Sequence, residues 1–286
     1  MTTTMIADKD TAKATGILHM IRADIDALQF RRWMGSRRLV DDDHAMHCLL
    51  TECFGRSYNA ESNPEGIAPR PFRLIIPRDG RRGTVYGYSR ADADELRDAA
   101  SLFACPLQSR VMPLASLDSK PMPSEWQAGR RLGFEVRIRP VVRPTKNAGL
   151  RSCDRHYMRD NSGQTCPYCR PRRECDAFQY EAIKYPRGEM KRGREEIYQE
   201  WLRNRFEHKG GAVLDVCATK LVSFRRTRAI RKLHRRYSEG PDALMRGELE
   251  ITDGAKFAEM LASGLGRHKA YGYGMILLRP AASSRR

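Results

Sequence analysis

Hydrophobic positions in the first half of the chain recur with two different periods. Short apolar or alternating runs predict strands, whereas apolar residues spaced three and four apart predict amphipathic helices. In chain order the segments predict strand, helix, strand, strand, helix and strand, which is the element order of a ferredoxin-like domain. The predicted strands are residues 14–21, 71–76, 84–88 and 108–114, and the predicted helices are residues 44–54 and 92–102.

The clearest of these helices follows three aspartates and precedes a glycine. Asp41 and its acidic neighbours supply an N-cap and favourable charge at the positive end of the helix dipole, and Gly55 suits the turn after the helix. Each residue advances about 100° around a helix, so His44 lies nearly opposite the apolar stripe, as a surface residue, and His47 lies at its margin. The stripe, at i, i+3, i+4 and i+7, consists of Met46, Leu49, Leu50 and Cys53.

The second half repeats this element order without repeating the sequence. We therefore expect an α+β protein of two tandem ferredoxin-like (RRM-like) domains. The first covers residues 1–118, a proline-containing linker covers 119–129, and the second covers 130–286 with a Cys/Arg-rich and helical insertion over about 145–210. Within the second domain, strands are predicted at 132–142, 212–224, 247–251 and 275–278, and helices at 194–203 and 253–263.

The composition indicates a polyanionic partner. A formal net charge of +17 and an isoelectric point near 9.8 exceed what solubility needs, so nucleic acid is the first expected partner and an acidic membrane the second. A hydrophobic content of 41% is sufficient for a globular protein. No apolar run has the length of a membrane span and the first residues lack a signal-peptide core, so we expect a cytoplasmic protein that does not enter a membrane.

Cations are concentrated in particular segments. Residues 31–38 are predicted to form a basic loop, either solvated or in contact with phosphate. On the strand at 132–142, the alternation places Arg137 and Arg139 on an open face, where they are candidate RNA contacts. The run at 225–236 is either a solvated face or a contact with the phosphates of an RNA stem, and its charge density favours the second. Its candidate RNA-binding residues are Arg225, Arg226, Arg228, Arg231, Lys232, Arg235 and Arg236.

A glycine-rich segment at 264–274 precedes the last predicted strand. Its two Gly-x-Gly pairs allow positive φ angles and close backbone approach, and consecutive backbone N–H groups form concavities suited to anions. The alternative is a plain connector before a buried strand. The candidate RNA-binding residues here are Gly264, Gly266, Arg267, His268, Lys269, Gly272 and Gly274.

Four cysteines lie in or near the insertion. A Cys-Pro-x-Cys turn is common in zinc sites, and four cysteines complete a tetrahedral structural site. The alternatives are reduced free cysteines or a redox pair. The four are Cys153, Cys166, Cys169 and Cys175, whereas Cys48, Cys53 and Cys217 are predicted to be core residues.

Four segments, in this order, resemble the RAMP superfamily of CRISPR RNA-handling proteins. The helix at 44–54 is similar to the first helix of the repeat-RNA endoribonucleases of the CasE type, with the pattern Tyr-x-x-His-x-x-Leu and a phenylalanine seven residues after the histidine. The strand at 134–144 resembles that family's Phe-x-Leu-Arg-x-x-Pro strand. The helix at 195–206 and the glycine-rich segment match in order.

The resemblance implies a metal-independent endoribonuclease that cuts CRISPR precursor RNA beside a repeat hairpin. Such an enzyme needs no cofactor for cleavage, and it often stays bound to the mature CRISPR RNA beside other effector-complex subunits. Two departures from the pattern are His44, which stands where the family has tyrosine, and the insertion. With the heavy arginine content, they point to a divergent branch such as the type IV CRISPR systems.

The chemistry of the residues permits this reaction. Cleavage without metal requires deprotonation of a 2′-OH, protonation of the leaving 5′-oxygen and stabilisation of the phosphorane charge, and it leaves a 2′,3′-cyclic phosphate. His47 is the candidate acid or base, assisted by His44, while Arg38 and Lys269 are candidates for charge stabilisation.

Three alternatives stay open. From the helix alone, His47 is better explained as a boundary histidine, and only the family resemblance favours a catalytic role. The whole chain is compatible with a non-catalytic RNA-binding subunit of the same superfamily, in which a histidine at the glycine-rich segment has no chemical task. A zinc-dependent nucleic-acid-binding regulator is the third interpretation, and it requires the four cysteines to be indispensable.

Overall fold

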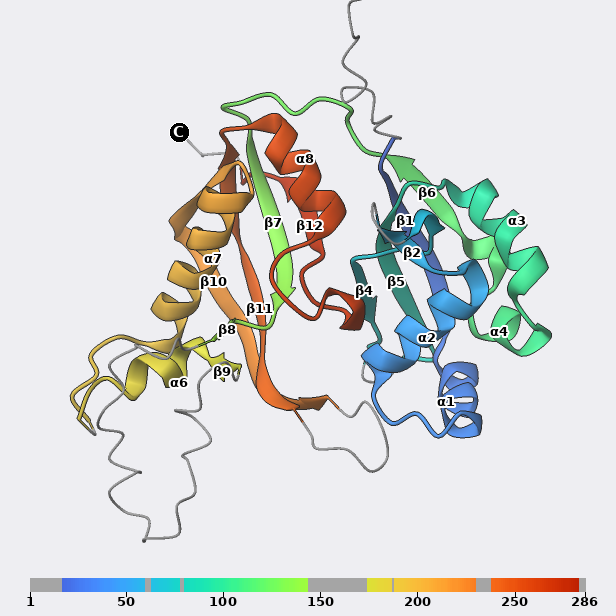
Figure 1. Cartoon of the computed structure of the whole chain (residues 1–286), viewed down its shortest axis with the longest axis horizontal. Coiled ribbons are helices and arrows are strands. Elements are labelled where there is room, and N and C mark those ends of the chain that lie inside the picture. The colour runs from blue at the N-terminus through green and yellow to red at the C-terminus, as the bar shows by residue number, and fades with distance from the viewer. Residues whose placement is uncertain are drawn as a thin grey trace, which may run out of the picture.

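The computed structural model describes residues 17–59, 63–77, 80–143, 174–186, 188–229 and 238–282. Two four-stranded antiparallel sheets lie side by side, each with helices against one face (Figure 1). The segment after the last helix lies between the two sheets. In the described ranges, no helix is both long and apolar enough to cross a membrane.

The first sheet has the ferredoxin-like strand order. Its spatial order is β4-β5-β1-β6, so the first strand lies between the third and the fourth, and the second strand is at the edge. The strands are β1 (His19–Asp26), β4 (Phe72–Ile75), β5 (Arg82–Ser89) and β6 (Asp118–Pro121), and the helices are α1 (Ala27–Ser36), α2 (Asp42–Phe54), α3 (Ala93–Phe103) and α4 (Pro106–Val111). A separate pair is formed by β2 (Ser57–Asn59) and β3 (Asn63–Ile67), and a short 3₁₀ turn, η1, spans Leu114–Ser116.

The second sheet has the same order, β10-β11-β7-β12, so the expected tandem ferredoxin-like fold is confirmed. Its strands are β7 (Arg131–Ile138), β10 (Ala212–Ala229), β11 (Ser238–Ile251) and β12 (Ile276–Pro280), and its helices are α7 (Arg194–Lys209) and α8 (Gly254–Ser263). Smaller elements are β8 (Val141–Val142), β9 (Cys175–Asp176), α6 (Ala177–Ala182) and the 3₁₀ turn η2 (Lys269–Tyr271).

Aspartate caps fix where several helices begin. The Asp26 carboxylate accepts from the backbone N–H groups of the first turn of α1, and Asp41 does the same for α2. Asp92 forms a reciprocal capping box with Glu95 on α3, and Asp253 caps α8. These caps explain why the helices at 44–54, 92–102 and 253–263 can be predicted from the sequence.

Two predictions for the first half are wrong. Residues 31–38 are mostly the second half of α1 rather than a loop, because Trp33 packs in the core and leaves Arg31 and Arg32 outside. Residues 108–114 are not a strand, since Pro106 opens α4 at the first helical position. The fourth strand, β6, lies instead in the segment that composition predicts to be linker.

The second half differs from its prediction mainly in strand length. Strands β10 and β11 are longer than expected, and β10 continues into the basic run at 225–236. Each half has its own core, and the core of the second half includes one residue of the first, because Tyr88 of β5 is 1% exposed among residues of the second half. Its hydroxyl donates to the carbonyl of Ile276 at 2.8 Å. The sheets are therefore tied to each other by packing as well as by the chain.

Candidate functional site

Helix α2 brings two histidines to the junction of the halves. The buried stripe of α2 (Met46, Leu49, Leu50 and Cys53) holds the helix against the first sheet, as predicted. Both His44 and His47 are half-buried on the other side, and the ring centroid of Tyr271 lies 5.8 Å from each imidazole centroid. His44 is therefore not the open surface residue that its helix position predicts, because η2 covers that side of α2.

Glycines let the segment at 264–274 approach the first half closely. A Cβ on Gly272 would lie 2.6 Å from a carboxylate oxygen of Asp43, and one on Gly264 would lie 2.8 Å from the side chain of Pro71. Both glycines have φ angles near +72°, which disfavour other residues. These two glycines therefore allow close packing of protein on protein. Whether the segment's N–H groups also bind phosphate stays a prediction.

A buried guanidinium joins this segment to both halves. Arg137 of β7 donates from Nε and Nη2 to the two carboxylate oxygens of Asp242, at 2.7 and 2.8 Å, and from Nη1 to Asp43 at 2.8 Å. It also lies over the ring of Tyr273, 4.4 Å from the centroid. The backbone N–H of Gly274 donates to the Arg137 carbonyl at 2.8 Å.

The prediction that Arg137 and Arg139 line an open face is wrong, because they are only 7% and 2% exposed. Helices cover one face of β7, and α2 with the glycine-rich segment covers the end of the other. Burial acts to raise the pKa of Asp242, but the hydrogen bonds and charges of Arg137 and Arg225 outweigh it and hold that pKa below its usual value. Burial likewise acts to lower the pKa of Arg137, yet its hydrogen bonds to Asp242 and the nearby negative charges raise it.

The environment of His47 favours its neutral form. Burial lowers the pKa of His47, and the positive charges of Arg70 and His44 lower it further. Neutral imidazole can accept a proton, which is the property a general base needs. Arg70 precedes β4 on the exposed side of the junction, so it places a cation near the histidine.

Two residues that were predicted to contact RNA, Arg267 and His268, form hydrogen bonds with the carboxylate of Glu174. Arg267 donates to Glu174 at 2.9 Å, and the His268 imidazole lies 2.8 Å from the other Glu174 oxygen. The hydrogen bond with His268 is the main reason that the pKa of Glu174 falls to about 2. Lys269 contacts the carbonyl of Gly264 at 3.4 Å.

The other predicted cations lie elsewhere. Arg38 is exposed in the turn between α1 and α2, with a φ of 54°. Arg225 is also tied to Asp242, at 2.7 Å. Arg226 pairs with Glu239 at 3.6 Å. Outside the described side chains lie Arg228, Arg231, Lys232, Arg235 and Arg236.

The proposed zinc ligands are mostly outside the described ranges. Cys153, Cys166 and Cys169 are not described, while Cys175 is buried in β9. Among the residues that are described, no three His, Cys, Asp or Glu side chains gather as a metal site. The zinc site thus stays a prediction. Cys217 is exposed rather than in the core.

Tyr271, Arg70 and the acidic partners of Arg137 were not predicted from the sequence. Tyr271 carried a weak signal, as an aromatic side chain inside a glycine-rich segment that enters a strand. Arg70 and Asp242 carried none, since their roles depend on contacts between distant parts of the chain.

Comparison with known protein families identifies the chain. The family described as CRISPR associated protein matches residues 18–280. The chain belongs to this family. A comparison with curated proteins gives no match.

Solved structures resemble this member of the CRISPR associated family in fold. The CRISPR endoribonuclease Cse3 bound to a 19-nucleotide RNA has a TM-score of 0.58 at 18% identity, covering 93% of this chain and 100% of that one. Cse3 of Thermus thermophilus, bound to an RNA representing a pre-cleavage complex, has a TM-score of 0.51 at 17% identity, covering 92% and 100%. A chain of a CRISPR RNA-guided surveillance complex has a TM-score of 0.52 at 13% identity, covering 92% and 100%. The type IV assignment is not tested by these comparisons and stays a prediction.

The buried network yields a stability prediction. We expect Arg137→Met to lower the free energy of unfolding by about 3–5 kcal/mol, because it leaves Asp43 without its cation and the buried Asp242 with Arg225 alone. Arg131→Met on the same strand is the matched control. Its guanidinium is half-exposed and pairs with Asp215 at 3.1 Å, so the loss should stay below about 1 kcal/mol. Urea unfolding measures both, and equal losses would contradict a special role for the buried network.

Proposed function

We propose that this protein is an endoribonuclease that cleaves CRISPR precursor RNA beside the repeat hairpin, without a metal ion. The observation that carries the proposal is the meeting of His44, His47 and Tyr271 at the junction of the two ferredoxin-like halves. Membership of the CRISPR associated family and the fold shared with RNA-bound Cse3 support it. The net charge of +17 suits a large RNA substrate.

The reaction begins at the 2′-OH of the nucleotide before the cut. Neutral His47 takes the proton of this hydroxyl, and the oxygen attacks the adjacent phosphorus. The bond from phosphorus to the 5′-oxygen breaks, and His44 or Tyr271 donates the proton that this oxygen needs. One product ends in a 2′,3′-cyclic phosphate and the other begins with a 5′-hydroxyl.

Cations near the histidines stabilise the phosphorane. Lys269 opens the 3₁₀ turn that contains Tyr271, and Arg70 lies close enough for its charge to lower the pKa of His47. Either cation can offset the charge that develops on the phosphoryl oxygens. Arg38 is a weaker candidate for this charge stabilisation. It becomes the leading catalytic candidate if neither histidine proves necessary.

The mature RNA stays bound after cleavage in this proposal. The basic run at 225–236 holds the hairpin through its phosphates, and other effector-complex subunits join the bound product. The shared fold with a chain of an RNA-guided surveillance complex supports this part. The competing function is that of a non-catalytic RNA-binding subunit, which binds the same RNA and does not cleave it.

The histidine assignment has a direct test. In EDTA, His47→Ala should cut a labelled repeat hairpin on the order of a hundred to ten thousand times more slowly than wild type, because the general base is lost. Its affinity for the hairpin should hardly change. His208→Ala, on the exposed side of α7, is the control and should cut normally.

Two further results bear on this reaction. A single 2′-deoxy substitution before the cut should block the wild-type enzyme, since the attacking oxygen is absent. Wild-type protein that binds the hairpin and yields no product would favour the non-catalytic subunit. Normal cutting by His47→Ala would remove the histidine from the mechanism.

The lowered pKa of His47 predicts the pH profile. The neutral imidazole forms as pH rises through this pKa, so kcat/KM should rise and reach its plateau with a midpoint below the ordinary histidine value of about 6.5. In Arg70→Gln, one of the charges that lower the pKa is gone, so the midpoint should move up. Single-turnover rates between acidic and neutral pH measure this, and an unmoved midpoint would show that another group titrates.

The basic run predicts salt dependence. Replacing Arg226, Arg228 and Arg231 by alanine should reduce the slope of log affinity against log salt by about one for each phosphate that the protein no longer neutralises. Arg225 is left in place because it also braces Asp242.

The matched control replaces three exposed arginines of the first half by alanine, which makes the same change in net charge. They are Arg81, Arg82 and Arg110. If both triple variants have the same slope, the run at 225–236 does not contact the RNA.

A further inference from the structure

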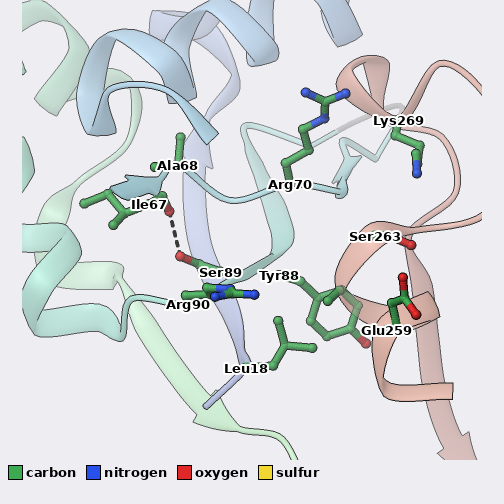
Figure 2. Close-up of a pocket in the computed structure, with 12 residues that line it drawn as sticks. Leu18, Ile67, Ala68, Arg70, Tyr88, Ser89, Arg90, Glu259, Ser263 and Lys269 are labelled. Carbon is green, nitrogen blue, oxygen red and sulfur yellow. Dashed lines mark hydrogen bonds between the residues drawn. The ribbon is translucent and has the colours of Figure 1, made fainter. Parts of the chain in front are cut away.

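A cavity of about 420 Å³ lies between the two halves, beside the candidate catalytic residues. Leu18, residues 66–68 and Tyr88 form the wall from the first half, and the end of α8, with Ser263, forms the opposite wall. Figure 2 shows Arg70 and Lys269 together on one side of this space, away from Leu18. The cavity therefore has a cationic side at Arg70 and Lys269 and, opposite it, an apolar wall at Leu18 and Tyr88 that is flanked by the guanidinium of Arg90 (Figure 2).

The apolar side is held by the protein itself. Leu18 and Tyr88 present hydrocarbon to the space (Figure 2). The Ser89 hydroxyl donates to the Ile67 carbonyl at 2.6 Å and accepts from the Ala91 N–H at 3.0 Å (Figure 2). These two hydrogen bonds hold the backbone of this wall in place. A ligand here meets a preformed surface on which a flat, largely apolar group can lie.

The cationic side adjoins the reaction centre. Lys269 and Tyr271 belong to the same 3₁₀ turn, and the Tyr271 ring lies 5.8 Å from that of His47. Arg70 is followed by Pro71, which packs against Gly264 of the glycine-rich segment. A phosphate bound between Arg70 and Lys269 would therefore lie next to the histidines.

We propose that the cavity binds one unpaired nucleotide of the RNA substrate, adjacent to the cleaved phosphate, with its base on the apolar side and its phosphate between Arg70 and Lys269. The proposal rests on the proposed function, which supplies the RNA. The volume falls within the range of roughly 300–1,000 Å³ found for small-ligand pockets. It is too small for a duplex, and proteins read RNA sequence mainly from unstacked single-stranded bases.

The carboxylate of Glu259 gives the pocket a means of choosing bases. Glu259 lines the wall that faces Leu18 and Tyr88 (Figure 2). A carboxylate accepts hydrogen bonds only, so it favours a base whose edge carries amino or imino N–H donors. Inorganic phosphate would use the two cations and leave the apolar wall and this acceptor unused.

The test combines a blocked pocket with RNAs that lack one base. Ser263→Trp places an indole at the mouth of the cavity from an exposed position near the end of α8. Ser101→Trp, at an exposed position near the end of α3, is the matched control. Repeat hairpins with a single abasic site at each unpaired position around the cut are compared with the intact hairpin for equilibrium binding and for single-turnover cleavage.

In wild type and Ser101→Trp, base removal at one position next to the cut should weaken binding about tenfold. In Ser263→Trp, the intact hairpin should bind about tenfold more weakly than to wild type, and the same abasic site should cause no further loss of affinity. Full additivity, or the absence of any sensitive position in wild type, overturns the proposal.

Two features keep the result decisive. Glu259→Trp fills the same space while removing an acidic charge, so weaker binding of the intact hairpin cannot be explained by electrostatics. It replaces Ser263→Trp if that variant does not fold. Binding and cleavage are measured separately, so a wild-type protein that binds but never cuts refutes the proposed reaction, while the binding comparison still decides the pocket.

Discussion

The buried guanidinium of Arg137 is the contact on which the arrangement of the two halves depends. It joins Asp242 of its own sheet to Asp43 in the first turn of α2, about one helical turn before His47. Desolvating these charges is costly, so the network is stable only when each partner is present with good geometry. The requirement for that geometry fixes the position of α2, and with it the histidines, relative to the second sheet.

Close packing supports the same arrangement. The glycine-rich segment reaches α2 because Gly272 leaves room for the Asp43 carboxylate, and the same approach brings Tyr271 against both imidazoles. A side chain at position 272 would move the Tyr271 ring away from the histidines, and it would at the same time strain the hydrogen bond between Asp43 and Arg137. The geometry of the histidine cluster and the stability of the junction therefore depend on the same few atoms.

Features that rest on local physical chemistry could be predicted from the sequence. The α2 helix could be predicted because its aspartate cap, apolar stripe and terminal glycine agree, and hydrophobic periodicity located the first three strands of the first half and all four strands of the second, in part or in full. The helix α1 was not predicted because its apolar stripe around Trp33 is only two turns long and is interrupted by charged residues. The fourth strand was missed because β6 is short and lies between prolines.

The candidate site was predictable only in part. His47 could be named from its position on α2, together with a family resemblance. The burial of Arg137 could not, because alternation along β7 says nothing of a helix from the other half that covers its open face. Nor could the meeting of Tyr271 with His44, which depends on the docking of two segments far apart in the chain.

The ion pairs of Glu174 have a consequence for how this protein can diverge. Arg143 directly follows β8 and Glu174 directly precedes β9, the two strands of a separate antiparallel pair, and these two side chains meet at 3.3 Å. Glu174 is also clasped by Arg267 and His268, beside the histidine cluster. Because Arg143 and Glu174 are joined, and the entropy of closing a loop grows only slowly with its length, a change in the number of residues between them should cost the junction little stability. Related chains can therefore differ in length at this point while the junction keeps its geometry.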